Sequence, residues 1–548
     1  MKKCISVSLL SFFSLIVLCQ HSQISISDDF KIAEKEYKDQ TVTHSIYHNG
    51  FFYTATNSGI GSNYKWAFTK LYDLKYAVTV SKFDRNMKKV GDYQLENGER
   101  NFGPLEPELI LLNNKLCLAY FQSDNKSSFN LYVALVDENN LTIKEPKKIC
   151  AILQENVGIF KLESVLNAGL VFFTHSADNT KTLIACNASP NTILTFVADN
   201  DLNILKQAVV HTNTTGFDIS SAVLTNDNVV CLVLDSKDET KVVCVNADGR
   251  KTETKLNPSG NLSPYSTNAS LARDNKSIYI YSAAAVQDRD DKPCNGLLLW
   301  QLDCSTLKLS RPLSYEFTPE VIEGIYQKGG GAKHKKEYWI YNFTPALVEL
   351  DNGNVVILGS PQQITERTST SAPNMENQTH MVSTTTLNVG PVIAFFLNKE
   401  GKTFDYALIP RRMNVSNSAS SGPGAIQVVQ APGISHSYSS FAATNLGNEI
   451  VIVYDDNESN LARDVNEKIA EAHSTGDLVL AEALINTDKK LQYRKQIGKN
   501  LSGKYTYYLG NSIPTSSSSS LIFPVAREGS GFNARKTFYT NWCFLDVK

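Results

Sequence analysis

The richest group of potential ligand-binding side chains lies in residues 327–339, QKGGGAKHKKEYW. This stretch combines three glycines and four lysines with His334, Tyr338 and Trp339. Positive charge and aromatic faces together suit an anionic or sugar ligand, and Trp66, in another long loop, is a further aromatic candidate. A solvated flexible loop is the alternative. The G-x-x-x-x-G-K-[ST] spacing is missing, so residues 327–339 are not a phosphate-binding loop of that type.

Three other groups carry charge in a pattern that suits ligand binding. Arg411 and Arg412 stand side by side and can pair with carboxylates, although an exposed arginine pair is the default interpretation. Two acidic groups resemble calcium ligands, namely Asp288, Asp290 and Asp291, and Asp455, Asp456 and Glu458. Neither group has the spacing of a calcium-binding loop. We therefore expect no cofactor and keep calcium open as an alternative.

The sequence contains no recognised catalytic signature. G-x-S-x-G, H-E-x-x-H and C-x-x-C are all absent. His44 and His48 fall in a predicted strand, where four residues span about 13 Å, too far to share a metal ion. Carboxylates gathered from the innermost strands of several blades are an alternative source of acid and base catalysis, as in glycosidases of this architecture.

The elements that position these residues are repeated strands. Residues 221–256 contain four runs of strand-forming residues, separated by the turn-forming residues 226–228, 236–239 and 246–249. Runs of Val, Leu and Cys bounded by Asn, Asp and Gly predict an antiparallel four-stranded meander. The same plan recurs along the chain, which makes repeat architecture the main prediction.

Seven full copies precede a C-terminal tail with three strands, and one unpaired strand stands at the N-terminus. If the tail and the N-terminal strand share a sheet, no exposed edge remains there. We therefore predict an all-β fold, an eight-bladed β-propeller closed by the N-terminal strand, with seven blades as the alternative. Specifically, residues 30–37 are expected to pair with residues 536–546. Residues 24–548 would form this single domain.

The period and turn plan resemble those of β-propellers of the kelch, WD and sialidase kinds. The kelch Gly-Gly, the WD dipeptide and the sialidase box are absent, so the resemblance is to the class only. The stretches LVELDNGNVVILGS and FAATNLGNEIVIVYDDN also resemble exported propellers found in Bacteroidota.

The N-terminus predicts export. Residues 1–22 begin Met1-Lys2-Lys3 and continue with an apolar run to Cys19 and a polar segment, as in a secretory signal peptide. A membrane anchor is the alternative, although the run is short for a span and lacks a cationic flank. Lipidation at Cys19 stays open, as does the choice between periplasm, outer-membrane surface and extracellular space. The formal net charge of −2 gives no reason to expect nucleic acid as a partner.

The connections between strands fall into two classes. In a propeller, first-to-second and third-to-fourth turns lie on one face, which we call the turn face. Second-to-third and blade-to-blade connections lie on the other, the loop face. We expect seven long insertions to lie on the loop face. Residues 462–473 are expected to form one short helix. The insertions are residues 57–75, 283–293, 327–337, 361–388, 410–438, 456–478 and 510–520.

Eight cysteines follow the predicted signal peptide. If Lys237-Asp238 forms a two-residue hairpin loop, Cys231 lies directly opposite Cys244. Directly opposed cysteines form either a strained cross-strand disulfide or a pair of buried thiols.

These observations favour an exported, non-catalytic binding or scaffold propeller whose loop face contacts a protein or glycan ligand. The alternative is a carbohydrate-active hydrolase or lyase with carboxylates on its inner strands. Two carboxylates that face each other within about 5–10 Å in a central pocket, at least one with a strongly shifted pKa, would favour the enzyme.

Overall fold

The computed structural model describes most of residues 23–546. The longer segments outside the described part are residues 1–22, 27–39, 61–74, 154–170, 287–293, 329–342, 371–380, 421–440, 498–505, 508–519 and 528–538. Residues 547–548 and several interior stretches of five residues or fewer are also outside it.

Five antiparallel sheets follow one another in the first part of the chain. The first contains β2 (Gln40–His48), β3 (Phe51–Ile60), β4 (Lys75–Phe83) and β5 (Lys89–Glu96). The second contains β6 (Phe102–Leu112), β7 (Lys115–Asn125), β8 (Ser128–Leu135) and β9 (Lys147–Leu153). The third contains β10 (Val171–His175), β11 (Thr182–Ser189), β12 (Thr192–Ala198) and β13 (Ile204–His211). The fourth contains β14 (Asp218–Leu224), β15 (Val230–Asp235), β16 (Thr240–Val245) and β17 (Lys251–Lys255). The fifth contains β18 (Leu262–Leu271), β19 (Ser277–Val286) and β20 (Gly296–Asp303), with β21 (Lys308–Leu309) and β22 (Leu313–Glu316) both paired to β20.

Three further sheets of four strands complete this series. The sixth contains β23 (Ala346–Glu349), β24 (Val355–Gly359), β27 (Val392–Leu397) and β28 (Phe404–Ile409). The seventh contains β30 (Phe441–Leu446), β31 (Glu449–Asn457), β32 (Leu478–Ile485) and β33 (Leu491–Gln496). The eighth has the strand order β1 (Gln23–Ile26), β36 (Tyr539–Asp546), β35 (Ser520–Arg527) and β34 (Thr506–Tyr507). The described helices are α2 (Pro319–Lys328) and α3 (Glu458–Leu461).

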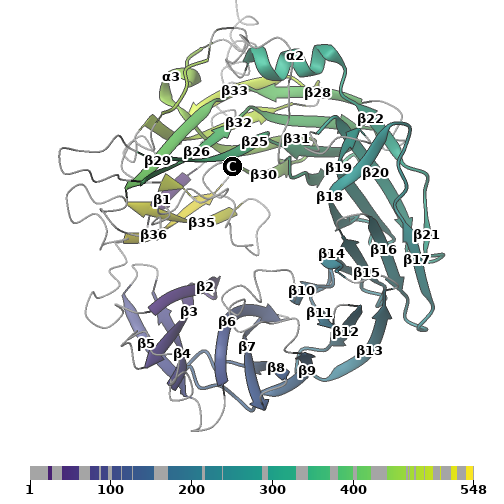
Figure 1. Cartoon of the computed structure of the whole chain (residues 1–548), viewed down its shortest axis with the longest axis vertical. Helices are drawn as coiled ribbons and strands as arrows, with labels where there is room; N and C mark the ends of the chain where they lie inside the picture. Colours follow the sequence, from purple (N-terminus) through teal and green to yellow (C-terminus); the bar gives the residue numbers. More distant parts are fainter. Residues whose placement is uncertain are drawn as a thin grey trace, which may run out of the picture.

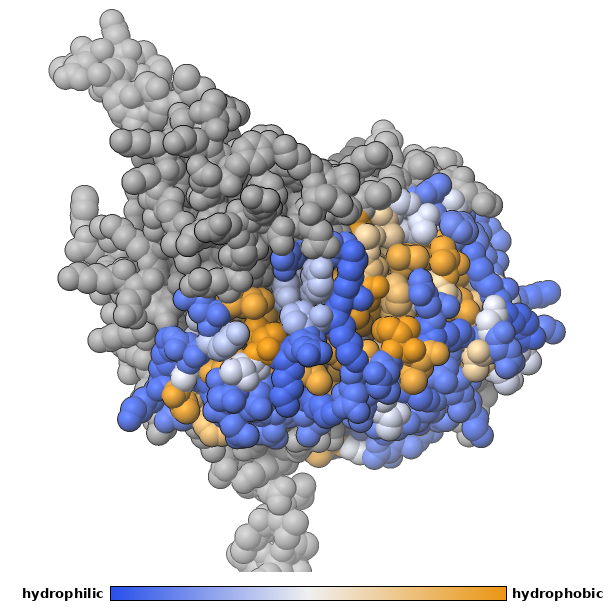
Figure 2. Space-filling model, turned by 90° about the horizontal axis from the view of Figure 1, so that it is seen from below, coloured by the Kyte–Doolittle hydropathy of each residue, from blue (hydrophilic) through white to orange (hydrophobic). Residues whose placement is uncertain are grey.

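The sheets stand around a common centre, with β2, β6, β10, β14 and β18 nearest to it (Figure 1). Neighbouring first strands contact one another, as β10 contacts β14 and β14 contacts β18. This arrangement of meanders is that of a β-propeller, and the predicted all-β propeller class is confirmed. Seen from below, the rim is largely hydrophilic with apolar patches between the polar side chains (Figure 2).

Six apolar clusters in the described part of the chain each lie between two successive sheets. Leu224 and Leu232 of the fourth sheet share a cluster with Leu183 and Phe217, while Val233 faces the other way and packs with Ile280 of the fifth. A sheet buried on both faces requires apolar residues at successive positions. That requirement explains the run VCLVLD in β15, in which every residue but the last is buried.

Tight turns fix the registers. Asn49 and Gly50 between β2 and β3 have φ angles of 50° and 82°, the left-handed conformation that a two-residue hairpin turn needs. The expected register in the fourth sheet is also found, since Cys231 is paired with Cys244 and Asp235 with Thr240. Cys231 and Cys244 are buried free thiols.

The N-terminal strand pairs with the predicted partner through a different segment. Gln23 lies opposite Asp546 and Ile26 opposite Cys543. The predicted residues 30–37 lie outside the described part.

The predicted helix over residues 462–473 is wrong. The described residues in that range are not helical, and the helix α3 ends at Leu461. Ala472 instead forms a bridge with Met413, and its N–H donates to the carbonyl of Arg412 at 3.0 Å. Pairing with a neighbouring strand outweighs the helix propensity of this segment.

One predicted insertion is an additional sheet. Residues 361–388 contain β25 (Gln362–Thr370) and most of β26 (Met381–Val389), and both pair in a three-stranded sheet with β29 (Met413–Ser420). We call this the extension sheet. Its strands continue β24, β27 and β28 beyond short breaks, at the end where the second-to-third connection lies. It therefore projects from the loop face.

The insertion at residues 510–520 was assigned to the wrong face. It connects β34 and β35, which are the first and second of the three C-terminal strands in the eighth sheet. By the alternation of antiparallel strands, this connection belongs to the turn face. Most of its residues lie outside the described part.

Candidate functional site

Most of the predicted ligand-binding residues lie outside the described residues. This applies to Trp66, His334, Tyr338 and Trp339, and also to the acidic group Asp288, Asp290 and Asp291. Arg411 and Arg412 are described, and both lie where the sixth sheet passes into the extension sheet.

Arg411 is fully buried, so the default interpretation of an exposed arginine pair is wrong. Its Nε donates to the carbonyl of Gly390 and its Nη2 to the hydroxyl of Ser360, each at 3.1 Å. These acceptors belong to the breaks in the two neighbouring strands. One guanidinium group thus connects all three strand breaks.

Proline explains why the strands break at this level. Pro361, Pro391 and Pro410 stand in the three breaks, and proline lacks the N–H that a continuous ladder needs. The N–H of Gly390 donates to the carbonyl of Pro361 at 2.9 Å, so the break is itself bridged. The buried arginine and this bond hold the extension sheet in a defined position.

Arg412 is paired at the surface. Its Nε lies 3.1 Å from Oε1 of Glu471, with side-chain exposures of 29% and 20%. Glu471 belongs to the segment that pairs with β29 through Ala472. The pairing with a carboxylate that the sequence suggested is therefore present, within the chain itself.

Two buried aspartates share the surroundings of Arg411. Asp455 and Asp456 are 1% and 0% exposed at the end of β31. Burial raises the pKa of Asp455 well above its usual range and that of Asp456 to about 7, while the charge of Arg411 opposes both shifts. Burial likewise lowers the pKa of Arg411. The three side chains form a buried charged cluster at the base of the extension sheet.

Asp456 also organises the following connection. Its Oδ1 accepts from the N–H of Asn457 at 2.8 Å and from Nδ2 of Asn460 at 2.7 Å. Glu458, the third predicted calcium ligand, is exposed. In the described part of the chain, no three His, Cys, Asp or Glu side chains are grouped to hold a metal ion.

A second pair of carboxylates lies on the loop face near the centre. Asp218 begins β14 and is paired with Asp235 at the end of β15. Directly opposed side chains have β-carbons about 4.5–5.5 Å apart. Thr240 Oγ1 donates to Asp235 Oδ1 at 2.5 Å.

Burial is the main cause of the raised pKa of Asp235, and the charge of Asp218 adds to it. Hydrogen bonds from Thr240, Ser220 and the backbone of Thr267 act in the opposite direction. Such a carboxyl pair, one member with a raised pKa, is the arrangement that acid and base catalysis requires. Asp218 and Asp235 are not among the predicted site residues, although the register that places Cys231 opposite Cys244 also fixes the end of β15.

Another carboxyl group, that of Glu108, belongs to the first strand of the second sheet. It lies on β6, and burial raises its pKa to about 7.

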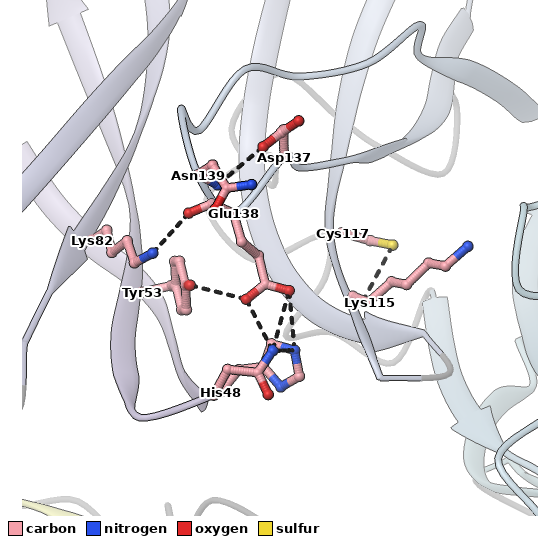
Figure 3. A network of polar contacts seen from close by, with 9 residues as sticks. His48, Tyr53, Lys82, Lys115, Cys117, Asp137, Glu138 and Asn139 are labelled. Carbon is pink, nitrogen blue, oxygen red and sulfur yellow. Dashed lines mark hydrogen bonds and ion pairs between the residues drawn. The ribbon is translucent and has the colours of Figure 1, made fainter.

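The turn face carries a polar network between the first and second sheets (Figure 3). Glu138 accepts from Tyr53 Oη at 3.1 Å and from Asn49 Nδ2 at 3.2 Å, and its Oε1 lies 3.2 Å from Nε2 of His48. Lys82 Nζ donates to the carbonyl of Glu138 at 2.7 Å. Because the carboxylate already has these partners, the network joins two sheets and is not poised to bind a substrate.

No protein-family model and no curated protein matches the chain. Among solved structures, the WD40 domain of SCAP from fission yeast is similar at a TM-score of 0.37 and 9% identity, covering 96% of this chain and 98% of that one. The β-propeller domain of the Trilobed protease from Pyrococcus furiosus gives 0.31 and 9%, covering 84% and 97%. The periplasmic gluconolactonase of Pseudomonas aeruginosa gives 0.30 and 13%, covering 71% and 88%.

Proposed function

We propose that this chain is an exported, non-catalytic binding propeller of the cell envelope or extracellular space, with its ligand site on the loop face. The observation that carries this proposal is the extension sheet. It adds three strands, β25, β26 and β29, beyond a sheet that already has four. A fixed, projecting element on a rigid scaffold is typical of a binding surface.

The proposal includes eight blades and ring closure by β1. Its support is the number of sheets with four or more strands, eight among the described residues, and the pairing of β1 with β36. Closure removes the free edge that β36 would otherwise present. A propeller of seven blades remains the alternative count.

The ligand is proposed to be a protein or a glycan. His334, Tyr338, Trp339 and Trp66 lie outside the described residues and keep their proposed role in binding. Arg412 is partly exposed at the base of that sheet. Arg411, being fully buried, acts by positioning the sheet.

Residues 1–22 are proposed as the signal peptide, and the location as periplasm, outer-membrane surface or outside the cell. Within the described residues, none of the helices has the length and apolar character needed to cross a membrane. Fractionation of cells expressing the full chain, with and without residues 1–22, tests export directly.

The binding test compares wild type with a variant in which residues 362–389 are replaced by an Asn-Gly turn. Both are applied to a glycan array and used to capture partners from native envelope. We expect the variant to lose the ligand that wild type retains. Asp248→Ala, in an exposed turn on the turn face, should bind as wild type does. Equal ligand binding by all three proteins would disprove the role of the extension sheet.

The second candidate function is a carbohydrate-active hydrolase or lyase, and the Asp218–Asp235 pair favours it. Asp235, with its raised pKa, would serve as the acid, and Asp218 as the base or nucleophile. Assaying wild type, Asp235→Asn and Asp218→Asn against a panel of polysaccharides tests this function. Activity that both variants retain would exclude these carboxyl groups.

A further inference from the structure

Two cysteines from different sheets meet in the interior. Cys150 lies on β9, the last strand of the second sheet, and Cys186 on β11, the second strand of the third. Both are free thiols in this structure, with sulfur atoms 3.0 Å apart. This is closer than the roughly 3.5–4.0 Å of an ordinary nonbonded contact between carbon atoms.

The contact lies within the apolar layer between the two sheets. Both residues belong to one cluster with Ile152, Ile184 and Phe196. Cys186 is 0% exposed and Cys150 7%. Such burial keeps both sulfurs away from reductants in solution once the sheets have packed.

We propose that Cys150 and Cys186 form a disulfide bond that joins the second and third sheets. The proposal rests on the exported location of the proposed function, because disulfides persist in oxidising compartments. As the S–S bond forms, each thiol loses one proton and one electron. A disulfide oxidant, such as oxidised glutathione or a protein disulfide, takes up the two protons and two electrons and is cleaved to two thiols.

The bond would add a covalent link where the sheets otherwise meet through side-chain packing. The two cysteines are 36 residues apart in the chain, and the connection between their sheets includes residues 154–170. Closing a loop of this size restricts the unfolded chain. The link therefore stabilises the contact between two neighbouring blades.

The other cysteines give internal controls. Cys117 lies in the same apolar cluster, but its Sγ donates to the carbonyl of Lys115, at 3.7 Å. Cys231 and Cys244 are opposed within one hairpin, whose strands a ladder already joins. A bond there would fix no contact between sheets.

The test begins with the denatured, reduced chain, refolded in a buffer of oxidised and reduced glutathione. The protein is then unfolded in denaturant with an alkylating reagent present, so that buried free thiols also react, and is digested with trypsin without reduction. Cleavage after Lys and Arg places Cys150 in peptide 149–161, Cys186 in peptide 182–206 and Cys117 in peptide 116–126. We expect the first two as a linked pair, lighter than their summed masses by two hydrogen atoms, and the third alkylated. Alkylation of both Cys150 and Cys186, or linkage of either to another cysteine, would overturn the proposal.

A second measurement uses the folded protein. Because burial protects the bond in the folded state, the protein is refolded either in the glutathione buffer or with a reductant alone; the reductant should lower the melting temperature of wild type more than that of the Cys150→Ala/Cys186→Ala double variant. Equal shifts would contradict the bond. Both measurements use purified protein and a defined oxidant, so a failure of export in cells would leave their results unchanged.

Discussion

Replacing Arg411 by methionine tests whether the buried charged cluster holds the extension sheet in place. The change removes the hydrogen bonds to Gly390 and Ser360. It also removes the positive charge that opposes the burial-driven rise in the pKa values of Asp455 and Asp456. Loss of such bonds costs about 1–3 kcal/mol of unfolding free energy. Removing one partner of a buried charge cluster costs about 3–5 kcal/mol when the remaining charges stay ionised.

The cost should depend on pH in a defined direction. The pKa of Asp456 is about 7 in the folded protein against an ordinary value of 3.8, so between these values the folded state binds more protons than the unfolded state. Stability therefore falls as pH rises through this window. At about 1.4 kcal/mol per pKa unit, the full effect is about 4 kcal/mol. Without Arg411 the folded pKa of Asp456 rises further, so the contribution of Asp456 to the stability of the variant continues to fall above pH 7, where its contribution to wild type has levelled off.

Urea denaturation followed by tryptophan fluorescence, at pH 6 and pH 8.5, measures this difference. We expect Arg411→Met to lose about 1–3 kcal/mol at pH 6 and about 3–5 kcal/mol at pH 8.5. The matched control is Arg412→Met, which breaks a partly exposed pair with Glu471 and should cost about 0–1 kcal/mol at both pH values. Equal losses for the two variants, or a loss at position 411 that does not grow above pH 7, would refute the reasoning.

Three other changes test separate parts of the structure. Deleting residues 23–26 removes β1 and exposes the edge of β36. We expect a lower melting temperature and more light scattering than after removal of residues 1–22 alone. An unchanged melting temperature would argue against ring closure. Glu138→Ala removes the acceptor shared by Tyr53 and Asn49. It should lower the free energy of unfolding, measured by urea denaturation, by about 1–3 kcal/mol, more than Tyr53→Phe does. A larger loss for Tyr53→Phe would contradict this account of the network. Gly359→Ala would place a β-carbon against the ring of Phe343, closer than van der Waals contact, and should cost about 1–3 kcal/mol. Gly390→Ala, whose nearest contact is 3.3 Å, should cost less when unfolding is measured under the same conditions.

Strand pattern and turn residues were sufficient for the propeller class and for one detailed register. The pairing of Cys231 with Cys244 follows from a hairpin that begins and ends within about fifteen residues, so it depends on local turn chemistry alone. The same arithmetic identifies Asp235 as the end of its strand. Its partner Asp218 could have been found by extending that register to β14, with the bulge between Ile219 and Ser221 taken into account.

Helix α2 shows a local signal that was present and overlooked. Thr318 precedes Pro319 and Glu320, a capping residue followed by proline and an acidic residue in the first turn. Thr318 Oγ1 accepts from the N–H of Val321 at 3.4 Å. The opposite error was made at residues 462–473, where helix propensity was outweighed by pairing with Met413.

The repeated meander follows from the sequence alone, because strand periodicity and turn conformation are properties of neighbouring residues. The burial of Arg411, the extension sheet and the approach of Cys150 to Cys186 were decided by the tertiary structure. In each case the partners are separated by tens of residues, and only the packing of whole sheets brings them together. The sequence shows Arg411 only as one of two adjacent arginines, which are usually exposed. The fold buries it among three strand breaks, two of which supply its hydrogen-bond acceptors.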